Sequence, residues 1–179
     1  MSRHIVLDIE TLDTVATARI LSAAMLWVDV DHGEVDVIKS MTLSIATDSQ
    51  PDRTASAATR DWWGKQPLEA RHAAFAAKSP IPLQNAVRMI AQQLEADPAP
   101  IWGNGSDFDN ATLAHAFAQQ GLEWPFRLNR CLRTLRATVD ALRPGFRPPV
   151  RPPELIPHIA QYDARYEATC LAALLHALD

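Results

Sequence analysis

The segment His4-Ile5-Val6-Leu7-Asp8-Ile9-Glu10 is the most informative in this chain, because it is an apolar run that ends on two acids. Such a run predicts a short buried strand. Alternate residues of a strand share one face, so Asp8 and Glu10 direct two carboxylates toward one point. Carboxylate oxygens are the ligands that Mg²⁺ and Mn²⁺ prefer. Taken alone, two acids at this spacing are a weak signal, because they equally describe a solvated strand end.

The elements that follow predict an α/β fold. Arg19–Val30 and Glu34–Ile45 are predicted strands, and the turn Asp31-His32-Gly33 between them makes an antiparallel hairpin. After residue 49 the pattern becomes helical, with a short strand at Ile101–Gly103 and room for another short strand after the helix that ends before Gly121. Helices are expected at 55–65, 68–78, 83–96, around 113–120, along a stripe from 128 to 142, and at 165–178. This order predicts a mixed sheet flanked by helices, formed by residues 1–179 as one domain.

Composition and charge limit the class of protein. The 179 residues are 47% hydrophobic and 21% charged, which is ordinary for a globular domain and unlike a disordered or fibrous chain. No apolar run is long enough to span a membrane. We expect a cytoplasmic protein, because Cys131 and Cys170 are far apart and the first residues do not resemble a signal peptide.

The distribution of charge is uneven. The net charge is −4, which argues against a protein that simply coats phosphates. Between Arg127 and Arg151, however, seven arginines and one acid give a local charge of +6. Most of these arginines are explained by a solvated helix face, but the segment leaves room for contacts with nucleic acid.

Two further acidic segments follow later in the chain. Asp107 and Asp109 come directly after the predicted strand Ile101–Gly103, and one of them would be explained as a helix cap. Asp163 lies near the start of the last predicted helix, where a cap is again the simpler explanation. His158 lies in the loop just before it, where a histidine is often only a bystander.

The order of these segments carries more information than any one of them. An Asp-x-Glu strand, an acid after Asn-Gly-x-x-Phe, and His-x-x-x-x-Asp near the end resemble the DEDDh exonucleases of the ribonuclease H-like superfamily. The similarity extends from His4 to about Leu175. It favours the histidine subtype, because residue 159, where the other subtype has tyrosine, is Ile159, and Tyr162 is out of register.

A narrower resemblance rests on Trp62-Trp63-Gly64-Lys65-Gln66, together with Asp8-Ile9-Glu10-Thr11-Leu12 and Gly103-Asn104-Gly105. These segments are similar to the compact phage and bacterial exonucleases called exonuclease VIII-like or 3′–5′ exoribonuclease-like. The resemblance implies a five-stranded mixed sheet of the ribonuclease H-like type. It also implies removal of nucleotides from the free 3′ end of RNA or single-stranded DNA.

The resemblance further implies roles for five residues. Asp8 would bridge two Mg²⁺ or Mn²⁺ ions, Glu10 and Asp163 would help to hold the ion that activates water, and Asp109 would hold the second ion. His158 would accept the proton of the attacking water. The product would be a nucleoside 5′-monophosphate, and the two ions would offset the charge of the four acids.

Substrate contacts are expected on both sides of these acids. Trp62 or Trp63 would stack on a base, although adjacent residues of a helix cannot share one face, so at least one is explained as core. Arg147 and Arg151 lie in a proline-rich loop and are further candidates for contact with nucleic acid. The full set of expected substrate-binding residues is Thr11, Leu12, Trp62, Trp63, Gln66, Asn104, Phe108 and Arg133.

Other interpretations stay open at the level of sequence. The same fold could serve as a catalytically idle nucleic-acid-binding module, but such a module would be expected to have lost an acid or the histidine. A phosphodiesterase specific for short oligonucleotides would keep the same site. A hydrolase using paired carboxylates without metal leaves the third and fourth acids unexplained. The sequence does not separate RNA from DNA, and it leaves open a homodimer through the alanine-rich segment 55–78.

Overall fold

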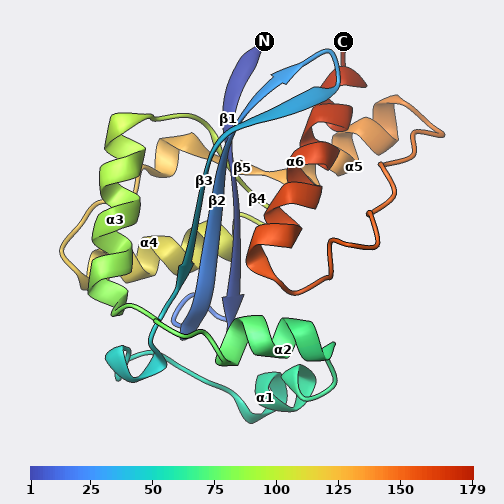
Figure 1. The fold of residues 1–179 in the computed structure, drawn as a ribbon. Helices are drawn as coiled ribbons and strands as arrows, with labels where there is room; N and C mark the ends of the chain where they lie inside the picture. The colour runs from blue at the N-terminus through green and yellow to red at the C-terminus, as the bar shows by residue number, and fades with distance from the viewer.

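A computed structural model describes residues 1–179 and shows a five-stranded mixed sheet with helices on both faces (Figure 1). The strand order is β3-β2-β1-β4-β5. β1 pairs antiparallel with β2 and parallel with β4, so the Asp8–Glu10 strand is central, as expected. The strands are β1 (Ser2–Thr11), β2 (Ile20–Asp31), β3 (Glu34–Ser44), β4 (Ile101–Gly103) and β5 (Asn129–Cys131).

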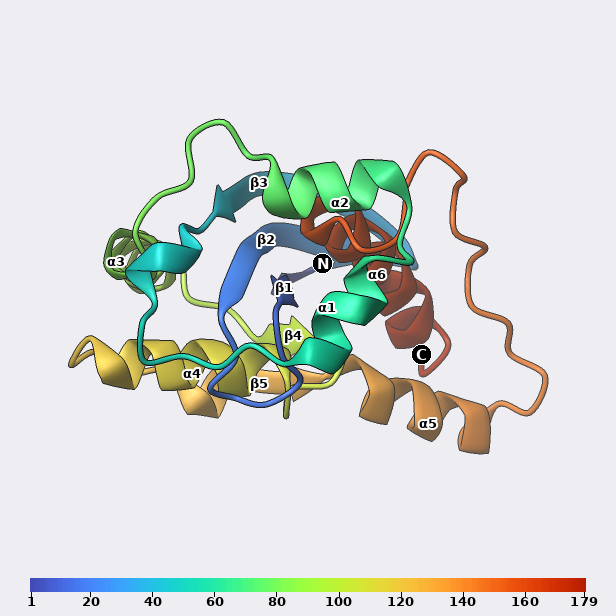
Figure 2. The ribbon, with the colours of Figure 1, turned by 90° about the horizontal axis from the view of Figure 1, so that it is seen from below.

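The helices surround the sheet in three groups. In Figures 1 and 2, α3 and α4 cover one face, α5 and α6 cover the other, and α1 and α2 lie below the end of β1. The helices are α1 (Ala57–Trp63), α2 (Leu68–Phe75), α3 (Leu83–Ala96), α4 (Asp109–Gln119), α5 (Leu132–Leu142) and α6 (Ala160–His176), with short 3₁₀ turns at Thr47–Ser49 and Phe126–Leu128. None of these helices has the combination of length and apolarity that crossing a membrane needs.

β1 has a core on each side because its side chains alternate. Ile5, Leu7 and Ile9 pack with residues of α3 and α4, whereas Val6 packs with residues of α5 and α6. Asp8 differs from Val6 by two positions, so it shares the face that α6 covers. The alternation that builds the two cores therefore also directs the acids of β1 toward α6.

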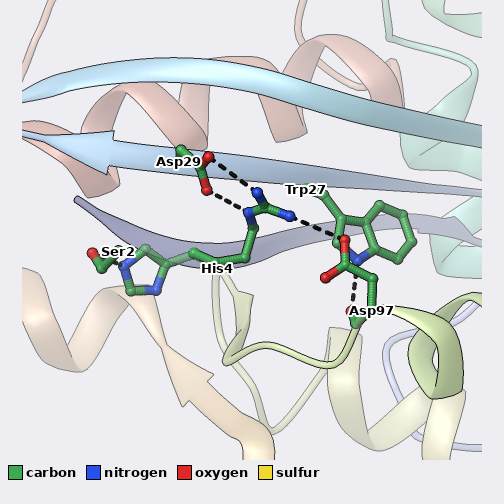
Figure 3. Close-up of polar contacts among 6 residues, drawn as sticks. Ser2, His4, Trp27, Asp29 and Asp97 are labelled. Atoms are coloured by element: carbon green, nitrogen blue, oxygen red, sulfur yellow. Dashed lines mark hydrogen bonds and ion pairs between the residues drawn. The ribbon is translucent and has the colours of Figure 1, made fainter.

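The end of β1 away from the acids is fixed by polar contacts (Figure 3). The guanidinium of Arg3 forms an ion pair with Asp29 on β2 and a second one with Asp97, at 3.1 Å, after α3. The indole N–H of Trp27 donates to the Asp97 carbonyl at 2.9 Å. These bonds fix β1 against β2 and the end of α3, so that its opposite end presents the acids from a rigid strand.

Two sequence-based expectations need correction. The helical stripe predicted from Leu128 is wrong at its start, because 129–131 form β5 and pair with β4, and the amide of Asn110 and the indole of Trp124 both donate to the Asn129 side chain. The last helix begins at Ala160, five residues earlier than predicted. The early start matters because it places Asp163 within the first turn of α6.

Candidate active site

The expected catalytic residues meet in one cleft at the end of β1. The cleft has a volume of about 630 Å³ and is bounded by β1, α1, the loop before α4 and the start of α6. Three separate elements each supply acids to it. The carboxylates that line it are Asp8, Glu10, Asp13, Asp109, Asp163 and Glu167, and His158 lies among them.

One group within the cleft has the spacing of a metal site. Glu10, His158 and Asp163 each offer a ligand atom, and these atoms lie within 4.8 Å of one another. Glu10 and Asp163 are buried, and His158 is partly exposed. The sequence placed these three residues on a strand, in a loop and on a helix, and the fold brings them together.

Asp163 is held by two partners. One of its carboxylate oxygens forms an ion pair with Arg151, and the other accepts the backbone N–H of His158 at 2.8 Å. The Arg151 guanidinium also lies 4.3 Å from the centre of the Tyr166 ring on α6. Arg151 was expected to contact nucleic acid, but here it neutralises a carboxylate of the site and fastens the proline-rich loop to α6.

His158 is positioned from its backbone and from its ring. Its φ is +65°, which lies in the left-handed region where a residue with a Cβ is strained by about 1–2 kcal/mol. The hydrogen bond from its N–H to Asp163 helps to hold that conformation. Its ring lies edge-on to Trp62, with 4.7 Å between the ring centres. The imidazole is thereby fixed beside Glu10 and Asp163.

Glu10, Asp109 and Asp8 hold their protons more strongly than ordinary carboxyls. Burial, and then repulsion from Asp163 and Asp109, raises the pKa of Glu10 to about 8. Burial raises the pKa of Asp109 to about 7, although backbone hydrogen bonds and Arg133 act in the other direction. Burial and four neighbouring acids raise the pKa of Asp8 well above its usual value. Acids this crowded favour either bound protons or bound cations.

The residues present fit a divalent metal ion. Asp8 is half-buried, and its Oδ2 atom has neither solvent contact nor a hydrogen-bond partner. A carboxylate oxygen buried in this way is costly unless a cation or a donor reaches it. All the candidate ligands are carboxylates and one imidazole, a donor set that suits hard or borderline cations such as Mg²⁺ and Mn²⁺.

The simpler explanation of two acids as helix caps is not what the structure shows. Phe108 occupies the cap position of α4, and Asp109 follows it in the first turn with its side chain in the cleft. Ile159 is the cap residue of α6, and Asp163 lies one turn further on. Neither helix has a side-chain cap bond at its start, so both acids are available to the cleft.

The side chains of the two adjacent tryptophans lie on different sides of α1, as expected for neighbouring residues of a helix. Trp63 is 2% exposed, packs with Leu12, and donates its indole N–H to the Thr11 carbonyl at 2.9 Å. Trp62 is 41% exposed and faces the cleft beside His158. Trp63 thus contributes to the cleft lining from a buried position, and Trp62 offers an exposed aromatic face.

The other expected substrate contacts divide into two sets. Asn104, Phe108 and Arg133 line the cleft, as does Thr11. Gln66 lies outside the cleft lining, and its amide donates to the Trp62 carbonyl at 2.9 Å. Leu12 also lies outside the lining, behind the wall and against Trp63.

Sequence reasoning missed two acids of the cleft lining, Asp13 on the loop after β1 and Glu167 on α6. Glu167 is 5% exposed, lines the cleft, and has a pKa raised well above its usual value by burial and by Asp109 and Asp163. It follows Asp163 by four residues on α6, and residues at that spacing lie on one helix face. This spacing was the signal that could have identified Glu167 from the sequence.

Comparison with solved structures places the fold in the ribonuclease H-like class of exonuclease I. The zinc-ion-bound complex of E. coli exonuclease I with single-stranded DNA is 19% identical, has a TM-score of 0.69, and is matched over 98% of this chain and 40% of that one. The complex of the E. coli enzyme with a dT13 oligonucleotide is 19% identical, has a TM-score of 0.69, and is matched over 98% of this chain and 41% of that one. Exonuclease I from Methylocaldum szegediense is 18% identical, has a TM-score of 0.68, and is matched over 98% of this chain and 40% of that one. This chain therefore spans about two fifths of the length of these enzymes.

Comparison with protein-family models assigns the chain to one family within this fold. The model of the 3′–5′ exoribonuclease Rv2179c-like domain matches residues 3–175, and the chain belongs to that family. No curated protein matches the sequence. The resemblance found from the acidic segments and from the Trp62-Trp63 element is confirmed at the level of the family.

Proposed function

We propose that this protein is a metal-dependent 3′–5′ exonuclease that releases nucleoside 5′-monophosphates from RNA or single-stranded DNA. The observation that carries the proposal is the convergence of Asp8, Glu10, Asp109, Asp163 and His158 in one cleft. Membership of a 3′–5′ exoribonuclease-like family supports the same reaction. The solved complexes of exonuclease I with single-stranded oligonucleotides support a single-stranded substrate.

The acids are proposed to hold two divalent cations, Mg²⁺ or Mn²⁺. Glu10 and Asp163 would hold one, Asp109 would hold the other, and Asp8 would contact both. When bound, these ions would supply Lewis-acid stabilisation of the attacking and leaving oxygens of a phosphodiester and would lower the pKa of water. The free Oδ2 atom of Asp8 supports its role as a shared ligand.

His158 is proposed to accept the proton of the attacking water. Its ring lies at the edge of the cleft, partly exposed, with a ring nitrogen near the oxygens of Glu10 and Asp163. A general base must lie within hydrogen-bond reach of the proton that it removes. The edge-on contact with Trp62 keeps the ring at this position while leaving it open to water.

The remaining cleft residues are proposed to hold the 3′ end of the chain. Trp62 would stack on a base, a contact worth about 1–3 kcal/mol. Arg133 forms no ion pair with any acid of the chain, so its guanidinium is free to bind a phosphate. The volume of about 630 Å³ is in the range of small-ligand pockets, so the cleft would hold the terminal nucleotides and not a long stretch of polymer.

The alternatives are weaker on specific grounds. A catalytically idle module would have no reason to retain four acids and a histidine in one cleft. A metal-free acid–base hydrolase needs two carboxylates, and the additional buried acids would only repel its substrate. A preference for short oligonucleotides keeps the same site and belongs to the same proposal. The proposal also includes a cytoplasmic location, and it leaves open a homodimer through segment 55–78, where Leu68 and Phe75 are exposed.

A time course on matched 5′-labelled single-stranded RNA and DNA tests the proposal. Each strand is incubated with Mg²⁺ or Mn²⁺, with EDTA as the control, beside Asp8→Asn. The expected result is a ladder that shortens from the 3′ end and disappears with EDTA and with the variant. Intact strands that are nevertheless bound would indicate the idle module. Degradation that survives both EDTA and Asp8→Asn would overturn the metal-dependent mechanism.

A further inference from the structure

Glu167 is a buried acid for which the proposed reaction has given no role. It lies on α6 one turn after Asp163, is 5% exposed, and lines the cleft. Its Oε2 atom has no solvent contact and no hydrogen-bond partner. A buried carboxylate without a partner is one of the most costly groups that a folded protein can contain. An unpartnered atom at this place points to a ligand that would occupy it.

The charges that surround Glu167 are mostly of its own sign. Asp8, Asp109 and Asp163 all lie close enough to repel it, and only the Asn104 side chain and, at a distance, Arg151 act in the opposite direction. Arg151 already forms its ion pair with Asp163. The chain therefore supplies no cation to Glu167, and the nearest charges increase the cost of its ionisation.

A second unpartnered atom lies in the same part of the cleft. Asp8 Oδ2 is buried without a hydrogen bond, and Glu167 is the acid that repels Asp8 most strongly. The two oxygens come from β1 and from α6, the helix that packs on the sheet face to which Asp8 belongs. Two buried, unpartnered carboxylate oxygens from separate elements form the kind of pair that a divalent cation joins.

This pair is separate from the group formed by Glu10, His158 and Asp163. Glu167 does not belong to that group, whose ligand atoms all lie within 4.8 Å of one another. Glu10 is repelled by Asp163 and Asp109, and Glu167 is absent from its strongest neighbours. Asp163 belongs to that group and also lies close enough to Glu167 to repel it, so the two sets of acids are neighbours in one cleft.

We propose that Glu167 is a fifth carboxylate of the metal centre, and that it helps Asp8 and Asp109 to hold the second divalent cation. This inference rests on the proposed function and adds a residue to it. The acids at this end are less tightly grouped than Glu10, His158 and Asp163, which fits Mg²⁺, an ion that retains several of its water molecules and takes few carboxylates directly. Oε2 is then a ligand to the ion or to its bound water.

Metal binding by the protein of residues 1–179, measured without substrate, tests this role. Mn²⁺ is titrated into metal-free protein and followed by calorimetry and by the electron paramagnetic resonance of free Mn²⁺. The proteins compared are the wild type, Glu167→Gln, Asp8→Asn and Glu95→Gln, which changes an exposed acid of α3. Glutamine keeps the shape of Glu167 and removes its charge.

The expected result is a loss of about 10–100-fold in affinity for one of two Mn²⁺ ions in Glu167→Gln, with the other ion retained. Asp8→Asn is expected to weaken both ions, and Glu95→Gln neither. A purely structural Glu167 would change thermal stability and leave the two Mn²⁺ affinities as in the wild type. That outcome overturns the inference.

The outcomes also separate this inference from the proposed function. If Asp8→Asn loses Mn²⁺ and Glu167→Gln does not, only the role of Glu167 is wrong. If the wild type binds no Mn²⁺, or if Asp8→Asn binds it as the wild type does, the metal-dependent function itself fails. If Glu167→Gln does not fold, Glu167→Asp is used instead, because aspartate keeps the charge but has a side chain shorter by one methylene. The Glu167→Asp variant is expected to bind the second ion several-fold more weakly, and unchanged affinity would overturn the inference.

Discussion

Replacing Glu10 by glutamine is expected to stabilise the metal-free protein at alkaline pH and to leave it unchanged at acidic pH. The pKa of Glu10 is about 8 in the folded chain, against an ordinary value of 4.5. Between these two values the folded chain holds a proton that the unfolded chain has released. The folded state is therefore progressively disfavoured as pH rises from about 4.5 to about 8, and the full penalty persists above that range.

The size of the effect follows from the same two values. A rise from 4.5 to about 8 corresponds to a ceiling of about 5 kcal/mol, at about 1.4 kcal/mol per pH unit. Water in the open cleft and adjustment of Asp109 and Asp163 reduce this figure, so we expect Glu10→Gln to gain about 2–3 kcal/mol at pH 9. For a chain of this length that corresponds to an increase of about 4–10 °C in Tm.

Thermal unfolding in EDTA, followed by circular dichroism at pH 5, 7 and 9, measures this difference. Glu95→Gln is the matched control, because Glu95 is exposed on α3 and its loss should leave the pH profile of the wild type unchanged. Added Mn²⁺ should then raise the Tm of the wild type at pH 8 more than that of Glu10→Gln. Parallel Tm profiles for the wild type and Glu10→Gln from pH 5 to 9 would show that the pKa of Glu10 is not raised in the folded chain.

Four further variants test other parts of the site. Trp62→Ala should raise KM by about 5–150-fold with little change in Tm, because an exposed stacking surface is lost. Trp63→Phe should lower Tm, because the hydrogen bond of a buried indole is lost. Steady-state kinetics and thermal unfolding curves distinguish the two effects. Arg151→Gln should release the ion pair with Asp163 and increase hydrogen exchange across residues 144–157; unchanged exchange would show that this ion pair does not fasten the loop. Gly103→Ala would place a methyl group in steric conflict with the side-chain amide oxygen of Asn110 on α4. It should cost about 1–3 kcal/mol in a urea titration, so a wild-type midpoint would contradict the packing.

Much of the fold could be predicted from local patterns. The run from His4 to Glu10 predicted the central strand, and the turn Asp31-His32-Gly33 predicted the hairpin that places β2 beside it. The apolar spacing of 83–96 predicted α3 with its observed bounds. A fifth strand was expected after the helix around 113–120, but the residues that form β5 could not be predicted, because a three-residue strand is specified by its pairing with β4 and not by its own composition.

The site was predictable only in part, and the reason is geometric. The four acids and His158 could be ordered by their motifs, but the motifs contain no information on what else faces the same cleft. Glu167 reaches it because α6 continues straight for another turn past Asp163. Arg151 reaches Asp163 through the path of an irregular loop, which no periodic pattern describes.

The most direct test of the central proposal is the identity of the first product. A single-stranded RNA that carries its label in the 3′-terminal nucleotide is incubated with Mn²⁺ and the protein, and early products are separated by chromatography beside Asp8→Asn and His158→Ala. The proposal predicts that the label is released first as a nucleoside 5′-monophosphate, and that both variants, shown to be folded, lose this release. Label appearing first in longer fragments, or as a free nucleoside, would contradict it.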